Sequence, residues 1–296
     1  MLSSPHIDFL SNRPTSLTAF SAPRPLRPTI DAAIVAAVNV RDDFITRRAE
    51  PGPGRGLGDW GEALAGLDLA AARLVKAEGG TAVYFAELLG QAVVLKRWTL
   101  RSRADAVKAF VHASRAERHW RGSQRLIDLG IPTAHCLAII DQGKGRTRER
   151  WLIMQRLPGR SALAHLASAD LPTRTQHALA RELAHHFTSL RHAGVVNRDP
   201  KPSNLIVTST DAEVACIAMI DCVAIRRGGR RRWLRSMAML AIEPIGCGVP
   251  IRRGLIARFI ATVEGGGKGE RLKLWRQLGE IVRGHGSAVP RVNPLG

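Results

Sequence analysis

Three polar side chains whose chemistry suits phosphoryl transfer lie close together in the second half of the chain. Asp199, Lys201 and Asn204 precede the apolar run 205–207. Transfer of a phosphoryl group from ATP requires a carboxylate that orients the attacking hydroxyl, a cation near the moving phosphoryl group, and oxygen ligands for Mg²⁺. We therefore predict that Asp199 is the catalytic base, that Lys201 neutralises charge on the phosphoryl group, and that Asn204 binds the metal. A turn between a helix and a strand is the alternative that composition alone would allow.

A second carboxylate, Asp221, follows another apolar run. Residues 205–207 and 216–220 have the composition of two short buried strands, and residues 208–213 supply a turn between them. A hairpin of this length returns the chain close to Asn204, where Mg²⁺ needs a further oxygen ligand. We therefore predict that Asp221 binds the metal together with Asn204. An aspartate that simply ends a strand is the alternative.

Lys96 is the candidate ligand for the nucleotide phosphates. It lies near the end of residues 92–98, which have the pattern of a strand, and Gly79 and Gly80 separate two strand-like segments upstream. This arrangement resembles the nucleotide-binding hairpin of a kinase amino-terminal lobe, where a strand lysine holds the α- and β-phosphates. The resemblance implies that Lys96 binds phosphate and that the glycine pair covers it. An ordinary turn is the alternative for the glycine pair.

In kinases the strand lysine has a glutamate partner on the following helix. Small and apolar side chains recur at helical spacing along residues 103–120, and Glu117 falls on the same side. We therefore predict that Glu117 pairs with Lys96. A solvated glutamate that pairs with a nearby arginine is the alternative.

Together these residues resemble the kinase superfamily and, within it, the bacterial lipopolysaccharide kinases, which phosphorylate heptose or Kdo sugars of the lipopolysaccharide core. Asp199 and Asn204 have the spacing of the kinase catalytic loop. Residues 92–98 resemble the lysine strand, and residues 151–159 resemble the strand and hinge beside adenine. The likeness extends over about residues 74–283. It implies an α+β, bilobal protein-kinase-like fold, with a small β-rich N-lobe that contains one helix and a larger, mainly helical C-lobe.

The resemblance also implies which ligands bind. ATP would contact Gln155 and Leu157 at the hinge, and Mg²⁺ would be held by Asn204 and Asp221. The acceptor would be a hydroxyl of a glycolipid or sugar, namely a heptose or Kdo of the lipopolysaccharide core. The expected activity is therefore that of an ATP-dependent phosphotransferase with an alcohol group as acceptor.

The chain departs from the family's pattern at several positions. Asn197 stands where the family has histidine, Pro200 replaces the usual leucine and removes a backbone donor, and Cys222 replaces Phe or Leu after the metal-binding aspartate. Counted back from the following Gly-Ile-Pro, the family's helix glutamate falls nearer His119 than Glu117. These changes remove no catalytic carboxylate or lysine, so we predict an active enzyme. A catalytically silent pseudokinase that binds a membrane or a partner is the alternative.

Little chain separates Asp221 from the arginine-rich residues 226–235, and no Ala-Pro-Glu follows. Protein kinases use the segment in that place to bind a peptide and to be switched on by phosphorylation. Its absence favours a small-molecule or glycolipid hydroxyl as the acceptor. A small-metabolite phosphotransferase and an atypical Ser/Thr protein kinase are the alternatives.

The composition calls for an anionic partner. The chain of 296 residues carries a formal net charge of +19 and a pI near 11.3, and six arginines gather in residues 226–235. Phosphorylated glycolipid and an anionic membrane surface fit this charge, since each basic residue near such a surface adds roughly 1 kcal/mol of attraction. Aromatic residues make up 5% of the chain and no nucleic-acid-binding motif occurs, so a nucleic acid is not the expected partner. Genomic bias towards arginine is the alternative.

Residues 1–56 combine a stretch rich in Pro, Ser and Arg, one expected helix within 31–50, and a Pro-Gly linker. We predict a disordered or linker extension there, an N-lobe over 57–155 and a C-lobe over 156–296. No stretch is suited to a membrane-spanning helix or a signal peptide. We therefore expect a cytoplasmic protein whose membrane attachment is peripheral, on the inner face of the inner membrane. The sequence indicates no oligomeric state.

Overall fold

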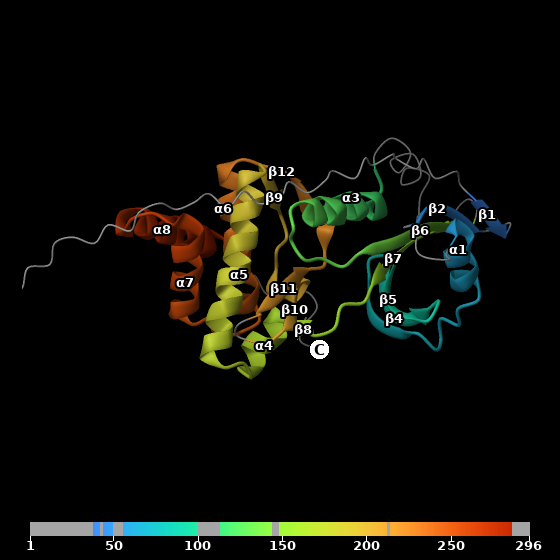
Figure 1. Ribbon diagram of the computed structural model, residues 1–296, viewed down its shortest axis with the longest axis horizontal. Coiled ribbons are helices and arrows are strands. Elements are labelled where there is room, and N and C mark those ends of the chain that lie inside the picture. The colour runs from blue at the N-terminus through green and yellow to red at the C-terminus, as the bar shows by residue number, and fades with distance from the viewer. Residues whose placement is uncertain are drawn as a thin grey trace, which may run out of the picture. The chain divides into compact units, whose positions relative to one another are not determined.

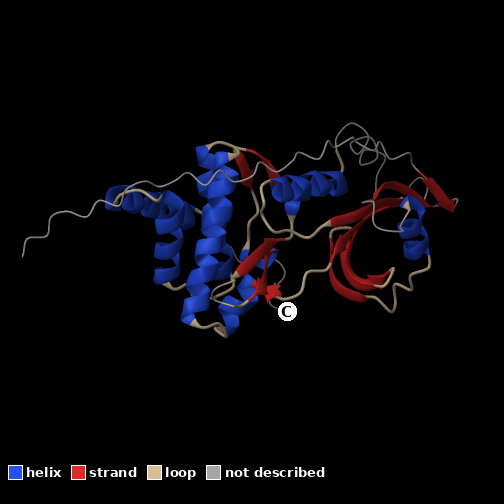
Figure 2. Cartoon of the chain, viewed as in Figure 1, coloured by secondary structure: helices blue, strands red, loops and turns tan. Residues whose placement is uncertain are grey.

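The structure is a computed structural model that describes residues 38–41, 44–49, 56–99, 113–143, 148–211 and 214–285. Within these ranges the chain is mixed α/β, with a seven-stranded sheet and seven α-helices. The strands of the large sheet all lie within residues 38–155, whereas helices α4 to α8 lie within residues 162–284 (Figures 1 and 2).

The large sheet carries the predicted lysine strand near its centre. Its order is β1-β2-β6-β7-β5-β4-β3, and every neighbouring pair is antiparallel. Along β5, Val93 and Leu95 are fully buried and Val94 between them is less so, as expected for a strand with one face on a core. The strand predicted at residues 92–98 is therefore confirmed. The seven strands are β1 Val38–Arg41, β2 Phe44–Ala49, β3 Arg73–Glu78, β4 Thr81–Leu88, β5 Gln91–Thr99, β6 Cys136–Gln142 and β7 Glu149–Gln155.

The helix expected within residues 31–50 is wrong for the residues that the structure describes there, because Val38–Arg41 and Phe44–Ala49 are strands. Strand β2 pairs with β6, from Phe44 opposite Gln142 to Ala49 opposite Ala138. A partner so distant in the sequence satisfies the backbone of β2, and local periodicity cannot indicate it. The sheet thus begins before residue 57, inside the predicted extension; residues 1–37 lie outside the described residues.

Helix α1, Leu57–Ala65, packs on β2 and β1. Trp60 and Leu64 of this helix are buried together with Tyr84 and Trp151, whose ring centroids lie 6.1 Å apart. This apolar cluster holds the helix on the sheet, because burying each large side chain contributes roughly 1.5–3 kcal/mol.

A second apolar cluster joins the helices of the carboxyl-terminal half. Phe187 packs edge-on against Phe259, and the Trp233 indole donates a hydrogen bond of 3.2 Å to the Phe187 carbonyl. None of the described helices has the length and apolarity needed to cross a membrane. The helices are α4 Ala162–Ser168, α5 Thr173–His192, α6 Arg230–Gly246, α7 Arg253–Glu264 and α8 Lys268–Gly284.

Two small antiparallel sheets contain the strands that border the predicted catalytic loop and Asp221. The strands predicted at 205–207 and 216–220 are confirmed as β10 Leu205–Ser209 and β11 Cys216–Met219, and β10 also pairs with β8 Arg160–Ser161. The other sheet pairs β9 Val195–Asn197 with β12 Ile225–Arg227. Two short 3₁₀ turns lie here: η2 Pro202–Asn204 ends the predicted catalytic loop, and η3 Cys222–Ala224 follows Asp221.

Helix α3, Arg115–Asp128, packs against η3. At Gly122 the two backbones are so close that an added Cβ would lie 2.0 Å from the Cys222 carbonyl oxygen. The segment after the helix continues the contact, because the Thr133 hydroxyl donates a hydrogen bond of 2.6 Å to the Met219 carbonyl. Residues 103–112 of the predicted helix lie outside the described residues.

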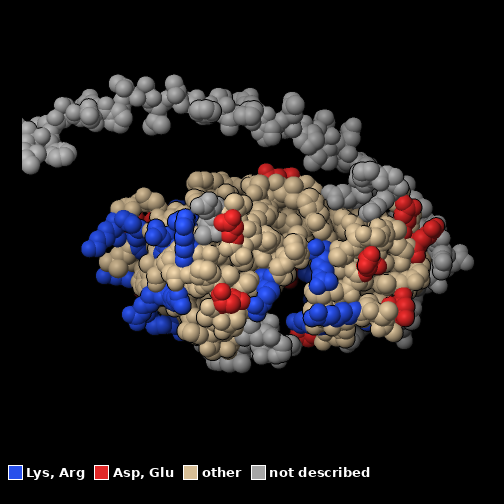
Figure 3. All heavy atoms as spheres, turned by 60° about the horizontal axis from the view of Figure 1, so that its bottom comes forward, with Lys and Arg blue, Asp and Glu red and all other residues tan. Residues whose placement is uncertain are grey.

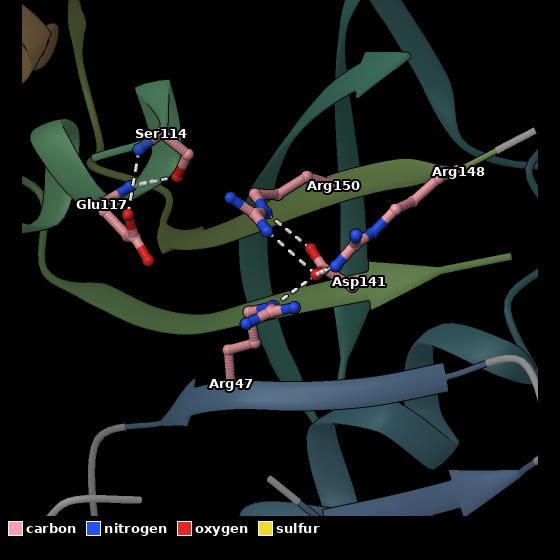
Figure 4. Close-up of polar contacts among 6 residues, drawn as sticks. All are labelled: Arg47, Ser114, Glu117, Asp141, Arg148 and Arg150. Atoms are coloured by element: carbon pink, nitrogen blue, oxygen red, sulfur yellow. Dashed lines mark hydrogen bonds and ion pairs between the residues drawn. The ribbon is translucent and has the colours of Figure 1, made fainter. Parts of the chain in front are cut away.

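A buried ion-pair cluster joins three strands near α3. Asp141 is 2% exposed and accepts hydrogen bonds from Arg47, Arg148 and Arg150, with 2.9 Å from Arg150 Nη2 to Asp141 Oδ2 (Figure 4). Burial raises the pKa of this carboxyl, but the hydrogen bonds and charges of Arg150 and Arg47 outweigh it, so the pKa falls to about 2. The cluster ties β2 and β7 to β6.

We predict that Asp141→Asn lowers the free energy of unfolding by about 3 kcal/mol, because it leaves the buried Arg150 without its anionic partner. The folded-state pKa of about 2 lies below the ordinary 3.8, so this carboxylate stabilises the fold above about pH 4 and loses its effect as the pH falls towards 2. Urea denaturation across this pH range measures both effects. Asp128→Asn on the exposed face of α3 is the matched control, and an equal loss in that variant would contradict the prediction.

We predict that Gly122→Ala lowers the free energy of unfolding by about 3 kcal/mol or more, because the new methyl group overlaps the Cys222 carbonyl and pushes α3 away from η3. Gly269→Ala in α8, where nothing lies within 4 Å, should leave stability equal or slightly higher. Thermal denaturation of both variants tests the pair. Equal stability of Gly122→Ala and wild type would show that the helix can shift without cost.

Candidate active site

Asn197 holds the backbone of the predicted catalytic loop. Its side chain is buried, and its Oδ1 atom accepts a hydrogen bond of 3.0 Å from the Asp199 backbone N–H. The Ser236 hydroxyl of α6 donates to the Asn197 carbonyl. Asparagine at this position therefore orients the start of the loop through hydrogen bonds of its own.

The three predicted residues of the loop lie together. Lys201 Nζ is 3.1 Å from Asp199 Oδ1, and both side chains are more than one third exposed, so they face solvent. The Asn204 Nδ2 donates a hydrogen bond of 3.1 Å to the Asp199 carbonyl. Because the amide nitrogen is used in this way, the Oδ1 atom of Asn204 remains as the group that can bind a cation.

Glu243 is a further residue of the site that the sequence patterns did not identify. Its buried carboxylate, on α6, accepts hydrogen bonds from the Ser203 backbone N–H at 2.8 Å and the Ser203 hydroxyl at 2.6 Å. The contact anchors the turn that carries Asn204 to the helical core. A signal exists in the sequence, since Glu243 is the only charged residue in the apolar run 236–251.

The β10–β11 hairpin returns the chain to the loop as predicted. The Ile220 backbone N–H donates a hydrogen bond of 3.0 Å to the Asn204 carbonyl, so Asp221 follows directly beside the loop. Lys96 Nζ lies 3.4 Å from Asp221 Oδ1. Burial raises the pKa of Asp221, but the charge and the hydrogen bond of Lys96 outweigh it, so the pKa is lowered. Asp221 is therefore an anion that can bind a metal.

Glu117 is not brought to Lys96. Its carboxylate accepts a hydrogen bond of 2.9 Å from the Ser114 backbone N–H, and the Ser114 hydroxyl accepts one from the Glu117 N–H, which together form a capping box at the start of α3 (Figure 4). The predicted Lys96–Glu117 pair is therefore replaced by the pair of Lys96 with Asp221.

His119 is the side chain that α3 directs towards Asp221. It is fully buried, and its Nδ1 atom lies 3.6 Å from Asp221 Oδ1, beyond hydrogen-bond distance. Among the described residues neither of its ring nitrogens has a hydrogen-bond partner. Burial first, and then the charge of Lys96, lower the pKa of His119 to about 3, although Asp221 acts in the opposite direction. The helix thus contributes a neutral imidazole where a glutamate would add a negative charge.

Gly79 and Gly80 form the two-residue turn between β3 and β4, with φ of +58° and +80°. Positive φ at both positions is typical of a type I′ hairpin turn and favours glycine. The Thr99 N–H donates a hydrogen bond of 2.9 Å to the Gly80 carbonyl, and Val83 pairs with Lys96. The turn thus lies at the tip of the hairpin beside the lysine strand.

Gln155 and Leu157 lie where the chain leaves the large sheet. The Gln155 N–H donates to the His135 carbonyl at 2.9 Å, and the Arg156 N–H donates to the Ala92 carbonyl at 3.1 Å. The Leu157 N–H makes no hydrogen bond to the part of the chain that the structure describes. It is therefore the one backbone donor of this segment that a ligand can use.

Two cavities lie near these elements. Gln155 and Leu157 line a pocket of about 440 Å³ that is also bounded by residues 127–135, β10 and β11; Lys96 and Asp221 are not among its lining residues. An apolar cavity of about 400 Å³ lies among α4 to α8, and its described lining includes none of the predicted site residues. The charged residues of the site and Asn204 therefore lie outside both cavities.

The arrangement joins a strand lysine, two side chains with oxygen atoms that could bind a metal, and a solvent-facing carboxylate. Lys96 comes from β5, Asp221 from the end of β11, and Asp199 and Asn204 from the loop after β9. Lys96 is paired with Asp221, and Lys201 with Asp199. If a phosphate bound the lysines and a cation bound the carboxylates, every charge would again have an opposite partner. This set of groups suits phosphoryl transfer.

Comparison with known families supports this interpretation. The model of the lipopolysaccharide kinase (Kdo/WaaP) family matches residues 77–236, more than half of the chain, and this segment contains every predicted site residue. The comparison with curated proteins gives no match. The family predicted from the catalytic loop and the lysine strand is confirmed, and the chain belongs to the lipopolysaccharide kinase (Kdo/WaaP) family.

Proposed function

We propose that the protein transfers the γ-phosphoryl group of ATP to a hydroxyl of a heptose or Kdo sugar in the lipopolysaccharide core. Family membership supports a kinase of lipopolysaccharide. The observation that carries the finer proposal is the 3.4 Å contact of Lys96 with Asp221, beside the loop that contains Asp199 and Asn204. Groups from three separate segments have the chemistry that phosphoryl transfer requires, in one place.

The fold that fits this function is the bilobal kinase arrangement. One apolar cluster lies within the large sheet and α1, and another joins α5 to α8, which supports two lobes with separate cores. The change from strands to helices after residue 155 supports a boundary at that position. The N-lobe then consists of the large sheet, including β1 and β2, with α1 and α3, so it has more than the one helix that the sequence predicted. The C-lobe begins at residue 156.

ATP would bind between the lysine strand and the segment after β7. The unpaired Leu157 N–H suits a hydrogen bond to adenine, with Gln155 beside it. Lys96 would leave Asp221 to bind the α- and β-phosphates, and the turn at Gly79 and Gly80 would lie over them. Lys96 suits this role because its side chain is only 14% exposed and because its partner, Asp221, is a carboxylate that a metal ion can bind in its place.

The residues present fit a magnesium ion. The carboxylate of Asp221 and the free amide oxygen of Asn204 are hard oxygen ligands, and Mg²⁺ takes few ligands from protein and the rest from phosphate and water. When bound, the ion would neutralise charge on the β- and γ-phosphates. The hydrogen bond from the Ile220 N–H to the Asn204 carbonyl holds the two ligands together.

Asp199 would orient the acceptor hydroxyl and take its proton as the oxygen attacks the γ-phosphorus. Asn197 positions Asp199 by accepting a hydrogen bond from the Asp199 N–H, and the Asp199 side chain is exposed to a substrate in solvent. Lys201 would then exchange the Asp199 carboxylate for the phosphoryl oxygens and neutralise their charge. The bond to the β-phosphate oxygen breaks, and ADP leaves.

A glycolipid acceptor implies contact with an anionic membrane surface. We propose that this attachment is peripheral and that it occurs on the cytoplasmic face of the inner membrane. Basic side chains gather over the part of the helical region that contains α7 and α8 (Figure 3). On α8, Leu272 and Trp275 are exposed between Arg271 and Arg276. Exposed apolar side chains among basic ones suit the interface of a bilayer.

We predict that Asp199→Asn lowers kcat by about 10²–10⁴-fold, because the amide cannot accept the proton of the hydroxyl. Transfer of labelled phosphate from ATP to lipopolysaccharide core glycolipid, with Mg²⁺ present, measures the effect. Asp128→Asn changes the same charge on an exposed helix face and should behave as wild type. Normal turnover of Asp199→Asn would remove this residue from the role of base.

We predict that Asp221→Asn abolishes the dependence of ATP affinity on Mg²⁺, because the site loses its only carboxylate ligand for the ion. Equilibrium binding of ATP with and without Mg²⁺ tests this independently of turnover. Metal-dependent affinity equal to that of wild type would exclude Asp221 from the metal site.

A further inference from the structure

Four exposed arginines from four different segments gather near the catalytic loop. Arg198 follows β9, Arg226 lies in β12, Arg118 in α3 and Arg232 in the first turn of α6. The pairing of β9 with β12 brings Arg198 to Arg226, because the Arg198 N–H donates to the Ala224 carbonyl at 3.3 Å. Helix α3 packs against β12 and adds Arg118.

The positive charge of this cluster is not balanced by the protein. None of the four guanidinium groups has an ion pair with a carboxylate in the described part of the chain. Burial, and then the charges of Arg198, Arg118 and Arg232, lower the pKa of Arg226. Guanidinium groups that repel one another in this way are stabilised by an anion that bridges them.

The N-terminus of α6 points to an anion at the same place. Its N-cap, Gly229, supplies no side-chain cap. The first turn contains no acidic residue and consists instead of Arg230, Arg231 and Arg232. The helix dipole already favours negative charge at this end, where backbone N–H groups lack partners. Cations in the first turn are therefore unfavourable unless an anion lies between them and the helix end.

The cluster is distinct from the ion pairs of the proposed nucleotide site. Asp221 pairs with Lys96 and Asp199 with Lys201, and none of the four arginines forms an ion pair with either carboxylate in the described part of the chain. Arg198, however, is the residue next to Asp199, so an anion bound here adjoins the loop that would orient the acceptor hydroxyl.

We propose that Arg118, Arg198, Arg226 and Arg232, with the N-terminus of α6, bind a phosphomonoester that the acceptor glycolipid already carries. A phosphomonoester offers a double negative charge and three oxygens, which match several guanidinium forks and free N–H groups at once. The assignment to the acceptor rests on the proposed kinase function. It makes a previously phosphorylated glycolipid the preferred substrate, held by one phosphate while another hydroxyl reacts.

Titration with inorganic phosphate tests the site without any turnover. The variant Arg226→Gln/Arg232→Gln should bind phosphate about 10- to 100-fold more weakly than wild type. The control Arg125→Gln/Arg181→Gln removes the same charge from exposed positions on α3 and α5 and should bind as wild type. In phosphate-free buffer of low salt, the cluster variant should unfold at the same or a higher temperature, because repulsion is relieved. Equal weakening in both variants, or an adventitious and unsaturable response, would overturn the proposal.

Two acceptors test the source of the phosphate. We expect wild type to have a KM about 10- to 100-fold lower for core glycolipid with its lipid A phosphates intact than for the same glycolipid without them. The ratio should fall towards one in the cluster variant and stay unchanged in the control. Equal use of both acceptors by wild type would overturn the assignment to the acceptor. If the cluster variant lost binding to phosphatidylglycerol vesicles but kept the KM ratio of wild type, the site would instead be one for membrane headgroups. Absence of transfer to either acceptor contradicts the proposed function, whereas the phosphate titration still decides whether the anion site exists.

Discussion

The geometry of the site depends on how closely helix α3 approaches the turn after β11. At Gly122 the helix backbone meets the Cys222 carbonyl without room for a side chain, and the bond from Thr133 to Met219 continues the contact. This is a steric constraint rather than a strong attraction. It holds α3 against η3, the turn that directly follows Asp221, and Asp221 lies 3.4 Å from Lys96. Close packing is therefore the condition for the electrostatic arrangement of the site.

The charges of the site are arranged for exchange. Lys96 and Lys201 are each paired with a carboxylate, and the buried imidazole of His119 is neutral, so α3 adds no negative charge beside Asp221. On the proposed function, a phosphate and a cation replace these ion pairs together, which avoids leaving a charged group desolvated and alone. The charges around Arg226 are not paired in this way, because several arginines lie together there without a carboxylate partner in the described chain. That contrast separates a site that is balanced without ligand from one that calls for an anion.

Local patterns predicted much of the fold around the site. The strands β5, β10 and β11 have short apolar runs, and a short turn between β10 and β11 leaves few ways for the chain to return, so their positions followed from periodicity. The family was likewise predictable from the catalytic loop and the lysine strand, and it is confirmed. Strands β1 and β2 were missed because their hydrogen-bond partner, β6, lies far along the chain. The role of Glu243 was missed for a similar reason, since Ser203 meets it only in the folded protein.

The sequence by itself determined the chemical groups, their order and the family, because these depend on residue types at short spacing. Only the tertiary structure decided which of them meet. Helical periodicity placed Glu117 on the side that faces Lys96, yet the free backbone N–H at Ser114 takes its carboxylate, and close packing at Gly122 presents His119 instead. A hydrogen bond at a helix end and a steric contact between distant segments together outweigh the simple facing of residues on a helix. The steric contact cannot be read from spacing along the chain, whereas the Ser-x-x-Glu spacing of Ser114 and Glu117 is that of a capping box and was a signal in the sequence.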